Sequence, residues 1–429
     1  MKESIKSLLL FVLVAASLIQ TYMLAYSKPY YEQVDEPEYI QPELIGTRAD
    51  AMELIYPTDI VLHLGDGQHV VLYPQNVFFN EIFNKIRMRS FGGFRQIERI
   101  AVDWFTFRER SRGVEIRFED SIPAAVLASV MEIEGQLPDR EDNFDKIWIT
   151  TNESGEEIRT FFINSWDNVT YEVTKADLTS KDIEQFVSFG DQYPVKYRSL
   201  SWSGILRTLY IPKTDLEMVS VKLNAEAFAS EQLQKSLFVN PGITRKLMER
   251  DGTEIYTDGK RGLQIYHDRF WMSYSDPNAP MASAADLSNQ LLAAVQFVNM
   301  HGGWNGDYRV ERYAISSDQE YLFRQYYRQY PIIDLNPQPF GMIKVVMNNG
   351  IVSLYERSIL MLTDVWGERE AAQLPGGEIL QAKIAEHPER SMIERVFPAY
   401  RPVLNEDQIL LTPIWVIEMA NGSKEYVWM

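Results

Sequence analysis

The longest hydrophobic stretch of the chain is LLLFVLVAASLIQTYMLAY, which occupies residues 8–26. None of these 19 residues is charged, and about 20 mainly apolar residues are needed for a helix to cross a ~30 Å hydrocarbon core. Lys2 and Lys6 precede the stretch, whereas Lys28 is followed by an acidic run. This bias places basic residues on the cytoplasmic side. The pattern therefore predicts a cytoplasmic N-terminus over 1–7 and a transmembrane helix over 8–26.

A cleaved signal peptide is the alternative interpretation of the same stretch. Signal peptides have a shorter apolar core of about 7–15 residues and end at an A-x-A-like site. Residues 14–16 (VAA) and 23–25 (MLA) match that site poorly. We therefore favour an uncleaved single-pass anchor, and under either interpretation the remainder of the chain lies outside the cytoplasm.

One face of the predicted span is a candidate contact surface for another membrane helix. Ser17, Thr21 and Ala25 recur every four residues and stack on one helix face, with Gln20 about 60° away on the same side. Small residues let two transmembrane backbones approach, and a glutamine can hydrogen-bond across the contact. We predict that these four residues bind a partner, although such residues also occur in anchors that only cross the bilayer.

After the anchor, the hydrophobic residues no longer form a continuous run but recur at short intervals. Residues 27–45 are rich in proline and acidic residues, which disfavours helix and predicts an extended stalk. Short alternating runs, interrupted by turn residues and a few amphipathic helices, then predict an α+β fold of antiparallel sheets with helices. We divide this region into three domains, 46–165, 166–280 and 281–429. The last two share a rhythm of helix followed by hairpins and are candidates for related units.

Several turn signals are strong enough to place hairpins. Asp-Gly pairs at 251–252 and 258–259 separate alternating apolar runs, and Ala-Asn-Gly at 420–422 is a type I′ candidate. Residues 283–300 have one apolar face and precede His-Gly-Gly at 301–303, which predicts a helix with a glycine C-cap.

Composition restricts the class of function. Hydrophobic residues make up 45% of the chain and aromatic residues 12%, which indicates packed cores, and the net charge is −18. Acidic surfaces repel nucleic acids and anionic headgroups, so we predict no nucleic-acid partner. The chain has no cysteine. This excludes thiol catalysis and cysteine-ligated metals, and it favours a bacterial envelope protein without disulfides.

His63 and His69 flank the Gly65–Gly67 turn. With a two-residue loop, His63 would pair with Val70 and His69 with Leu64, which makes the histidines diagonal neighbours that could in principle share a metal. No third ligand is evident, so we predict no metal site. The turn also begins like a dinucleotide-binding G-x-G-x-x-G, but a strand follows it instead of a helix, and we predict no cofactor.

Other motifs with chemical potential lack their required partners. The HGGWNG stretch at 301–306 is similar to the oxyanion stretch of lipases, but the chain has no G-x-S-x-G elbow. Acidic clusters at 139–142 and 153–157 could supply a glycosidase pair, yet both lie in turn-like sequence. We predict no catalytic residues and no enzymatic activity.

Aromatic residues give one further candidate surface. The nine tryptophans are dispersed, which favours core packing over a carbohydrate-binding platform. Residues 321–331 hold five aromatics and two arginines. That combination is typical of a binding surface or, alternatively, of a buried helix face whose arginines reach solvent.

Five strings in this order resemble the YycH (WalH) family of Gram-positive bacteria. They are LYP at 72–74, DGKRGL at 258–263, HGGW at 301–304, FRQYYRQYPI at 323–332 and LTPIW at 411–415. The resemblance covers essentially the whole chain and is strongest after about residue 237. None of the strings is specific alone.

The resemblance implies a regulator of the WalK/YycG sensor histidine kinase that acts with a YycI-like membrane protein to control cell-wall homeostasis. It also implies that the transmembrane helix contacts the kinase and that no catalytic residues carry over. The contact face of Ser17, Gln20, Thr21 and Ala25 rests on helix geometry only. We expect a single-pass protein of a Gram-positive cell membrane that biases the kinase by packing energy.

The sequence leaves two other classes of function to consider. The exported region could be a ligand-binding module that senses a cell-wall fragment or peptide, and this is the main alternative. A cell-wall hydrolase is disfavoured by the missing catalytic motifs.

Overall fold

The computed structural model describes most of the chain. The described residues are 2–26, 46–98, 102–135, 142–152, 155, 157–201, 208–277, 287–313, 319–348, 350–363, 367–405 and 408–428. Contacts divide the chain into an N-terminal unit, Met1–Ile40, and a C-terminal unit, Gln41–Met429, which are described separately. The predicted stalk, 27–45, lies outside the described residues.

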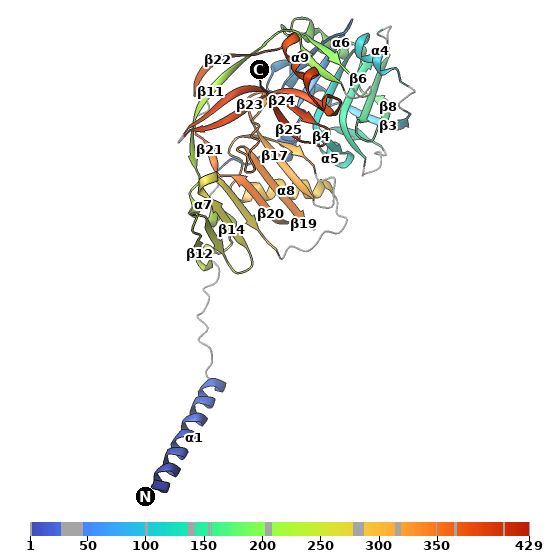
Figure 1. Ribbon diagram of the computed structural model, residues 1–429. Helices are drawn as coiled ribbons and strands as arrows, with labels where there is room; N and C mark the ends of the chain where they lie inside the picture. The colour runs from blue at the N-terminus through green and yellow to red at the C-terminus, as the bar shows by residue number, and fades with distance from the viewer. Residues whose placement is uncertain are drawn as a thin grey trace. The chain divides into compact units, whose positions relative to one another are not determined.

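The N-terminal unit contains one helix, α1, over Lys2–Tyr26 (Figure 1). Its 25 residues make it about 37 Å long at 1.5 Å per residue. The window Ile5–Tyr22 is long and apolar enough to cross a membrane, and none of it is buried. The predicted helix over 8–26 is therefore confirmed.

The C-terminal unit is built on three mainly antiparallel sheets, which confirms the predicted α+β class. The largest sheet has ten strands, and among the described residues its one parallel pairing is β3 with β5. In spatial order they are β10 (Leu209–Pro212), β9 (Tyr197–Leu200), β2 (Gln68–Leu72), β1 (Asp59–Gly65), β4 (Arg112–Pro123), β6 (Asn143–Thr151), β7 (Ile158–Asn164), β8 (Val169–Ala176), β3 (Ser90–Ile97) and β5 (Glu132–Glu134).

Helices cover both faces of this sheet because alternate residues of each strand point to opposite sides. On one face, α3 (Val77–Arg87) and α6 (Ser180–Asp191) pack on Ile60 and Leu62 of β1. On the other, α4 (Trp104–Glu109) places Trp104 against Trp148 of β6. The short helices α2 (Ala51–Leu54) and α5 (Ala124–Val130) complete this part of the chain.

The nine-stranded sheet lies beside the first. Its strands, in order, are β12 (Arg245–Met248), β13 (Glu254–Thr257), β14 (Gly262–Tyr266), β15 (Trp271–Ser275), β20 (Ile351–Ser358), β19 (Met342–Asn348), β17 (Glu320–Tyr327) and β16 (Asp307–Arg312), and β18 (Tyr330–Pro331) pairs with β17. The predicted hairpins at 251–252 and 258–259 are confirmed as the β12–β13 and β13–β14 turns. Helix α7 (Ser230–Leu237) packs on β14, and α8 (Leu287–Met300) packs on β19 and β20. Two short 3-10 turns complete this part: η2 (Pro241–Ile243) joins α7 to β12, and η3 (His267–Arg269) joins β14 to β15.

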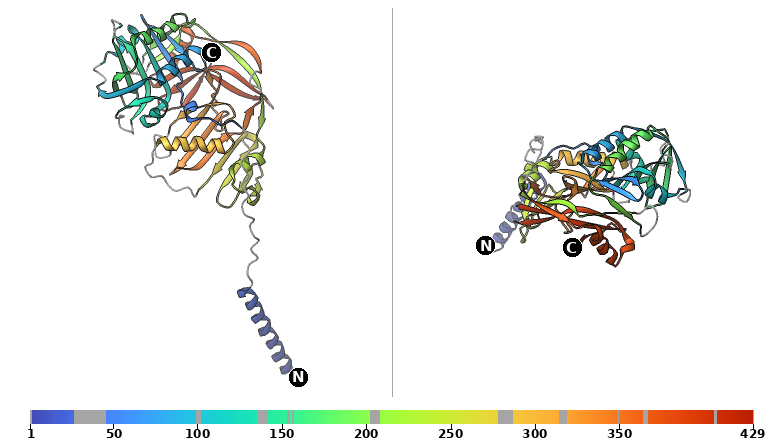
Figure 2. Two further views of the ribbon diagram at one scale, coloured as in Figure 1. Left: turned by 180° about the vertical axis from the view of Figure 1, so that it is seen from behind. Right: turned by 90° about the horizontal axis from the view of Figure 1, so that it is seen from above.

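The six-stranded sheet forms a layer along one side of the unit (Figure 2). It contains β21 (Leu360–Leu362), β11 (Leu216–Ala227), β24 (Gln408–Met419) and β23 (Ile393–Asn405), with β22 (Glu368–Leu374) paired to β11 and β25 (Lys424–Val427) paired to β24. The hairpin predicted at 420–422 joins β24 to β25. Helix α9 (Gly377–Glu386) and turn η4 (Arg390–Met392) lie between β22 and β23 in the chain.

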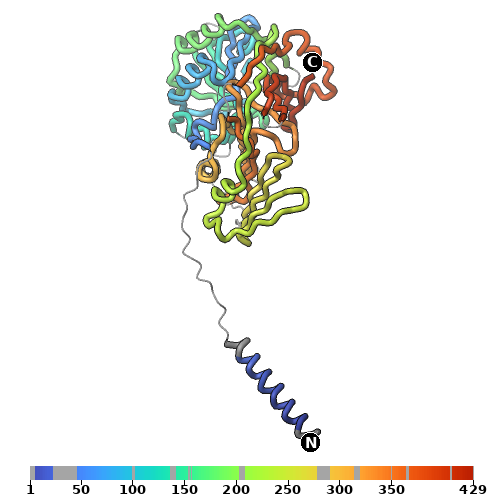
Figure 3. The backbone as a smooth tube through the Cα atoms, turned by 90° about the vertical axis from the view of Figure 1, so that its left-hand side faces the viewer, coloured from blue at the N-terminus to red at the C-terminus, as the bar shows by residue number. Residues whose placement is uncertain are grey.

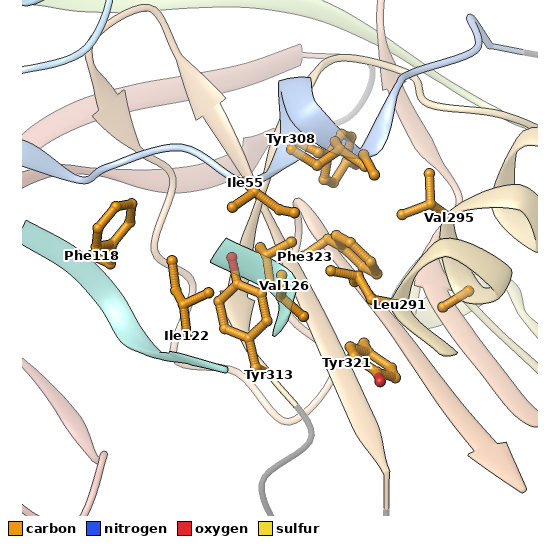
Figure 4. Packing of buried hydrophobic residues seen from close by; sticks show 14 of the residues in the cluster. Ile55, Phe118, Ile122, Val126, Leu291, Val295, Tyr308, Tyr313, Tyr321 and Phe323 are labelled. Carbon is orange, nitrogen blue, oxygen red and sulfur yellow. The ribbon is translucent and has the colours of Figure 1, made fainter. Parts of the chain in front are cut away.

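Apolar residues join the sheets into shared cores. Ile122 of β4 and Val126 of α5 lie in one cluster with Leu291 of α8 and Phe323 of β17 (Figure 4). A second cluster joins Val61 of β1 to β24. The division of 46–429 into three domains stays a prediction. In the described structure, β7 and β8 are neighbours in one sheet, and β15 and β20 are neighbours in another.

Candidate functional site

The predicted contact face of α1 is exposed where the structure describes it. Ser17, Gln20 and Thr21 all present exposed side chains, and Ala25 lies one turn after Thr21 in the same helix. The Thr21 hydroxyl donates to the Ser17 carbonyl oxygen at 2.8 Å, so this face carries one hydroxyl already satisfied within its own helix. The Gln20 amide is then the stronger donor that the face can offer to another helix, and its partner-binding role stays a prediction.

The two candidate histidines meet on the second face of the ten-stranded sheet. The expected diagonal register is wrong, because His63 pairs directly with His69. The register shifts between His63 and Gly65, and this irregularity absorbs the extra residue of the turn. The two Nδ1 atoms lie 3.1 Å apart, and both side chains are fully buried.

Two glutamates extend this pair into a chain of polar contacts. Glu115 Oε2 lies 3.4 Å from His63 Nε2, and Glu109 Oε1 lies 3.8 Å from His69 Nε2. A neutral imidazole carries one N–H hydrogen, so a neutral His63 can donate to His69 or to Glu115 but not to both. The Tyr210 hydroxyl also donates to Glu115 at 2.7 Å. Burial lowers the pKa of His63 to about 4, which keeps this imidazole neutral near pH 7.

Among the described residues, no group of three or more His, Asp and Glu side chains is placed to hold a metal ion. His63 stacks on Trp148 with ring centroids 5.1 Å apart, so its packing is that of a core residue. His63, His69 and Glu115 thus form a row of buried polar side chains on this face of the sheet.

The HGGW stretch caps α8 and holds the start of the C-terminal unit. Gly302 and Gly303 have φ of 109° and 73°, which glycine adopts without a Cβ clash. The Gly46 amide donates to the Gly302 carbonyl at 2.8 Å, and Thr47 exchanges two backbone hydrogen bonds with Trp304. These residues therefore fix the point where the chain enters the folded unit, a role that the sequence did not reveal.

The structure describes the acidic clusters only in part and the aromatic stretch 321–331 in full. Asp139–Glu141, Glu153–Ser154 and Glu156 lie outside the described residues, while Asp142 accepts a hydrogen bond from the Tyr171 hydroxyl at 2.7 Å. The 321–331 stretch forms β17 and β18, and four of its five aromatic side chains are buried. The predicted burial of this stretch is therefore confirmed, but the predicted helix is wrong, and Arg324 is itself buried.

A buried ion network that no sequence pattern indicated joins the three sheets. It contains Glu119 of β4, Glu311 of β16, Arg324 of β17, Arg395 of β23, Glu418 of β24 and Lys424 of β25. Lys424 Nζ lies 2.7 Å from Glu311, 3.0 Å from Glu418 and 3.3 Å from Glu119. Arg324 lies 2.7 Å from Glu311, and Arg395 lies 2.5 Å from Glu119.

The network balances three carboxylates with three cations. Burial lowers the pKa of Lys424, but the three carboxylates around it outweigh this effect and raise that pKa above its ordinary value. Burial raises the pKa of Glu418 despite the neighbouring Lys424. Each of the three sheets contributes charged residues to the network, so displacing one sheet would break its ion pairs with the other two.

One surface hollow of the C-terminal unit measures about 770 Å³. It lies between the β11–β22 pair and the β17–β18 turn, and it is lined by Met218, Ala372, Arg328, Tyr330 and Tyr400 among others. Its size is compatible with a small molecule or peptide side chains. The ligand-binding interpretation stays a prediction.

Comparisons with known proteins match nearly the whole chain. Residues 3–192 match the family model of the YycH protein N-terminal domain, and residues 206–427 match that of the YycH protein C-terminal domain. The Bacillus subtilis "Two-component system WalR/WalK regulatory protein YycH" is 21% identical over 443 aligned positions, which cover 98% of this chain and 95% of that protein. The crystal structure of YycH from Bacillus subtilis superposes with a TM-score of 0.72 at 20% identity, covering 90% of this chain and 99% of that one.

Proposed function

Because this chain belongs to the YycH family, we propose that it is a membrane-anchored regulator of a two-component sensor histidine kinase of the WalK/YycG type. The observation that carries the proposal is the match along 98% of the chain to a relative that is named as a WalR/WalK regulatory protein. The regulator is single-pass, with a cytoplasmic N-terminus, in the membrane of a Gram-positive cell. A YycI-like protein acts with it in controlling cell-wall homeostasis.

The mechanism that we propose is non-enzymatic. A regulator shifts a kinase between two states only by its differential affinity for them, and a coupling free energy of 1–3 kcal/mol is typical. Two features support a role without chemistry. His63 and His69 are fully buried, and His301 lies at the C-terminal end of α8, where its Nδ1 donates to the Ser236 carbonyl oxygen.

The proposed contact to the kinase uses the α1 face of Ser17, Gln20, Thr21 and Ala25. Small side chains let two helix axes approach closely, and the Gln20 amide supplies an interhelical hydrogen bond. Contacts of the C-terminal unit with the kinase and the YycI-like protein would add to this helix pair.

A bulk substitution on α1 tests the contact in the full chain co-expressed with its kinase. Ser17→Leu fills the predicted face, whereas Ala15→Leu makes the same kind of change about 160° away around the helix. We expect Ser17→Leu to reduce kinase co-purification and to change kinase autophosphorylation, with Ala15→Leu close to the unchanged protein. Equal behaviour of the two variants would contradict a specific helix face. Full regulation after replacement of the whole span by an unrelated one would contradict any role for it.

A further inference from the structure

Residues 235–250 form a protruding segment that combines exposed apolar and basic side chains, and we call it the β12 tip. Val239, Ile243, Leu247 and Met248 are 57%, 57%, 55% and 66% exposed. The tip runs from the end of α7 through η2 into β12. It belongs to the lobe at one end of the unit, drawn in yellow-green in Figure 3.

The exposure of these apolar side chains follows from the position of β12 in the sheet. β12 is an edge strand of the nine-stranded sheet, and within the described residues it pairs only with β13. All four residues of β12 are exposed, because α7 packs on β14 instead. The Gln234 side-chain amide donates to the Pro241 carbonyl and to Thr244, so the tip is braced with its apolar groups turned outward.

The charge of the tip is opposite to that of the whole chain. Between residues 235 and 250 there are four cations, Lys235, Arg245, Lys246 and Arg250, against the single acid Glu249, whereas the chain carries −18. Lys246 pairs with Glu254 at 3.0 Å, and Arg245 and Arg250 are exposed. Apolar side chains interspersed with Lys and Arg suit the interface of a bilayer that contains anionic lipid.

The tip also lies near Gly46, the first described residue of the C-terminal unit. Gly46 is hydrogen-bonded to Gly302, and the adjacent His301 contacts the Ser236 carbonyl, three residues before Val239. Nineteen residues separate Tyr26 from Gly46, and such a segment spans no more than about 70 Å. A connection of this length allows the C-terminal unit to contact the bilayer that α1 crosses.

We propose that the β12 tip docks on the anionic surface of the bilayer in which α1 is anchored. Val239, Ile243, Leu247 and Met248 enter the headgroup region, and Arg245 and Arg250 face lipid phosphates. Docking would set the orientation of the C-terminal unit above the membrane. This inference requires the anchor and is independent of the identity of the kinase.

The absence of cysteine allows a direct test with single-cysteine variants of the full chain in vesicles. Leu247→Cys is labelled with an environment-sensitive fluorophore. In vesicles containing phosphatidylglycerol, we expect a blue-shifted emission that brominated lipid quenches. In pure phosphatidylcholine, and at high salt, the shift and the quenching should decrease.

Ile379→Cys is the matched control. Ile379 is 56% exposed and lies in α9, which Figure 1 shows at the other end of the unit from β12. Its label should respond to neither lipid. Equal responses at both positions, or no quenching at Leu247→Cys, would overturn the proposal.

A charge reversal separates the membrane from a protein partner. Arg245→Glu with Arg250→Glu should abolish quenching of the Leu247→Cys label while leaving the thermal unfolding temperature unchanged. If the emission instead follows the protein density in the vesicles and not the lipid composition, a second copy covers the tip and the inference is wrong. If the tip does not dock but the kinase still co-purifies with the chain, only the docking inference is wrong and the proposed function is retained.

Discussion

Replacing Lys424 by methionine is expected to destabilise the C-terminal unit by about 3–5 kcal/mol, the usual cost of leaving a buried charge uncompensated. The Lys424 ammonium has three carboxylates within 3.3 Å, and its side chain is 11% exposed. Methionine keeps most of the aliphatic stem, so little packing is lost. The remaining network then holds three carboxylates and two cations, so one negative charge is left without a counter-charge among carboxylates that are only 9–13% exposed.

The pH dependence of this loss follows from Glu418. Burial raises the pKa of Glu418, and Lys424 opposes that rise. Without Lys424 the pKa of Glu418 rises further above its unfolded value. A folded carboxyl with a raised pKa binds its proton more tightly than the unfolded chain does, so acidification through that pKa stabilises the folded state. The deficit of Lys424→Met should therefore shrink as the pH is lowered and Glu418 takes up its proton.

A double-mutant cycle measured by urea denaturation of the full chain in detergent provides the assay. Lys424→Met with Glu418→Gln restores charge balance and should recover at least about 2 kcal/mol of the single-variant loss. Lys344→Met is the control, because Lys344 is 25% exposed and 3.1 Å from Glu320, and such a pair contributes at most about 1 kcal/mol. Additive effects in the cycle, or a loss for Lys424→Met no larger than for the control, would refute the reasoning.

Three further predictions concern other parts of the fold. The pKa of His63 is 6.5 unfolded and about 4 folded, so its contribution is complete above pH 6.5 and is lost as the pH falls toward 4. Acidification from pH 7 to pH 5 should cost about 2 kcal/mol at this site, and urea denaturation of His63→Gln should lack that component; an unchanged pH dependence would contradict it. A Cβ on Gly46 would lie 2.4 Å from the Trp304 carbonyl oxygen. Gly46→Val should therefore speed hydrogen exchange of the Thr47 amide, while the main unfolding transition shifts by less than about 2 °C. A Thr47 amide that stays protected from exchange would contradict this anchoring contact. A Cβ on Gly190 of α6 would meet Leu64 at 2.7 Å, so Gly190→Val should lower the free energy of unfolding by about 1–3 kcal/mol, and a neutral result would show that α6 can move away from β1.

The predictions that succeeded rest on local chemistry. Asp-Gly pairs at 251–252 and 258–259 specify tight turns through backbone conformations that few residues adopt, and the structure has hairpins there. The register of His63 and His69 was wrong for a local reason as well. The alternation of apolar and polar residues in a sequence does not reveal where a β-bulge occurs. The extra residue beside Gly65 could therefore be identified only from the pairing of the strands.

The sequence alone determined the membrane-length helix, the α+β class, the turns and the family, because each depends on residues that are close in the chain or on a linear series of strings. The tertiary structure alone decided which distant segments meet. Glu119, Glu311 and Lys424 share one buried network, and Gly46 pairs with the end of α8. The sequence around a single charged residue does not tell whether its side chain is solvated or buried. Only the packing of three sheets removes the water and makes its partner obligatory.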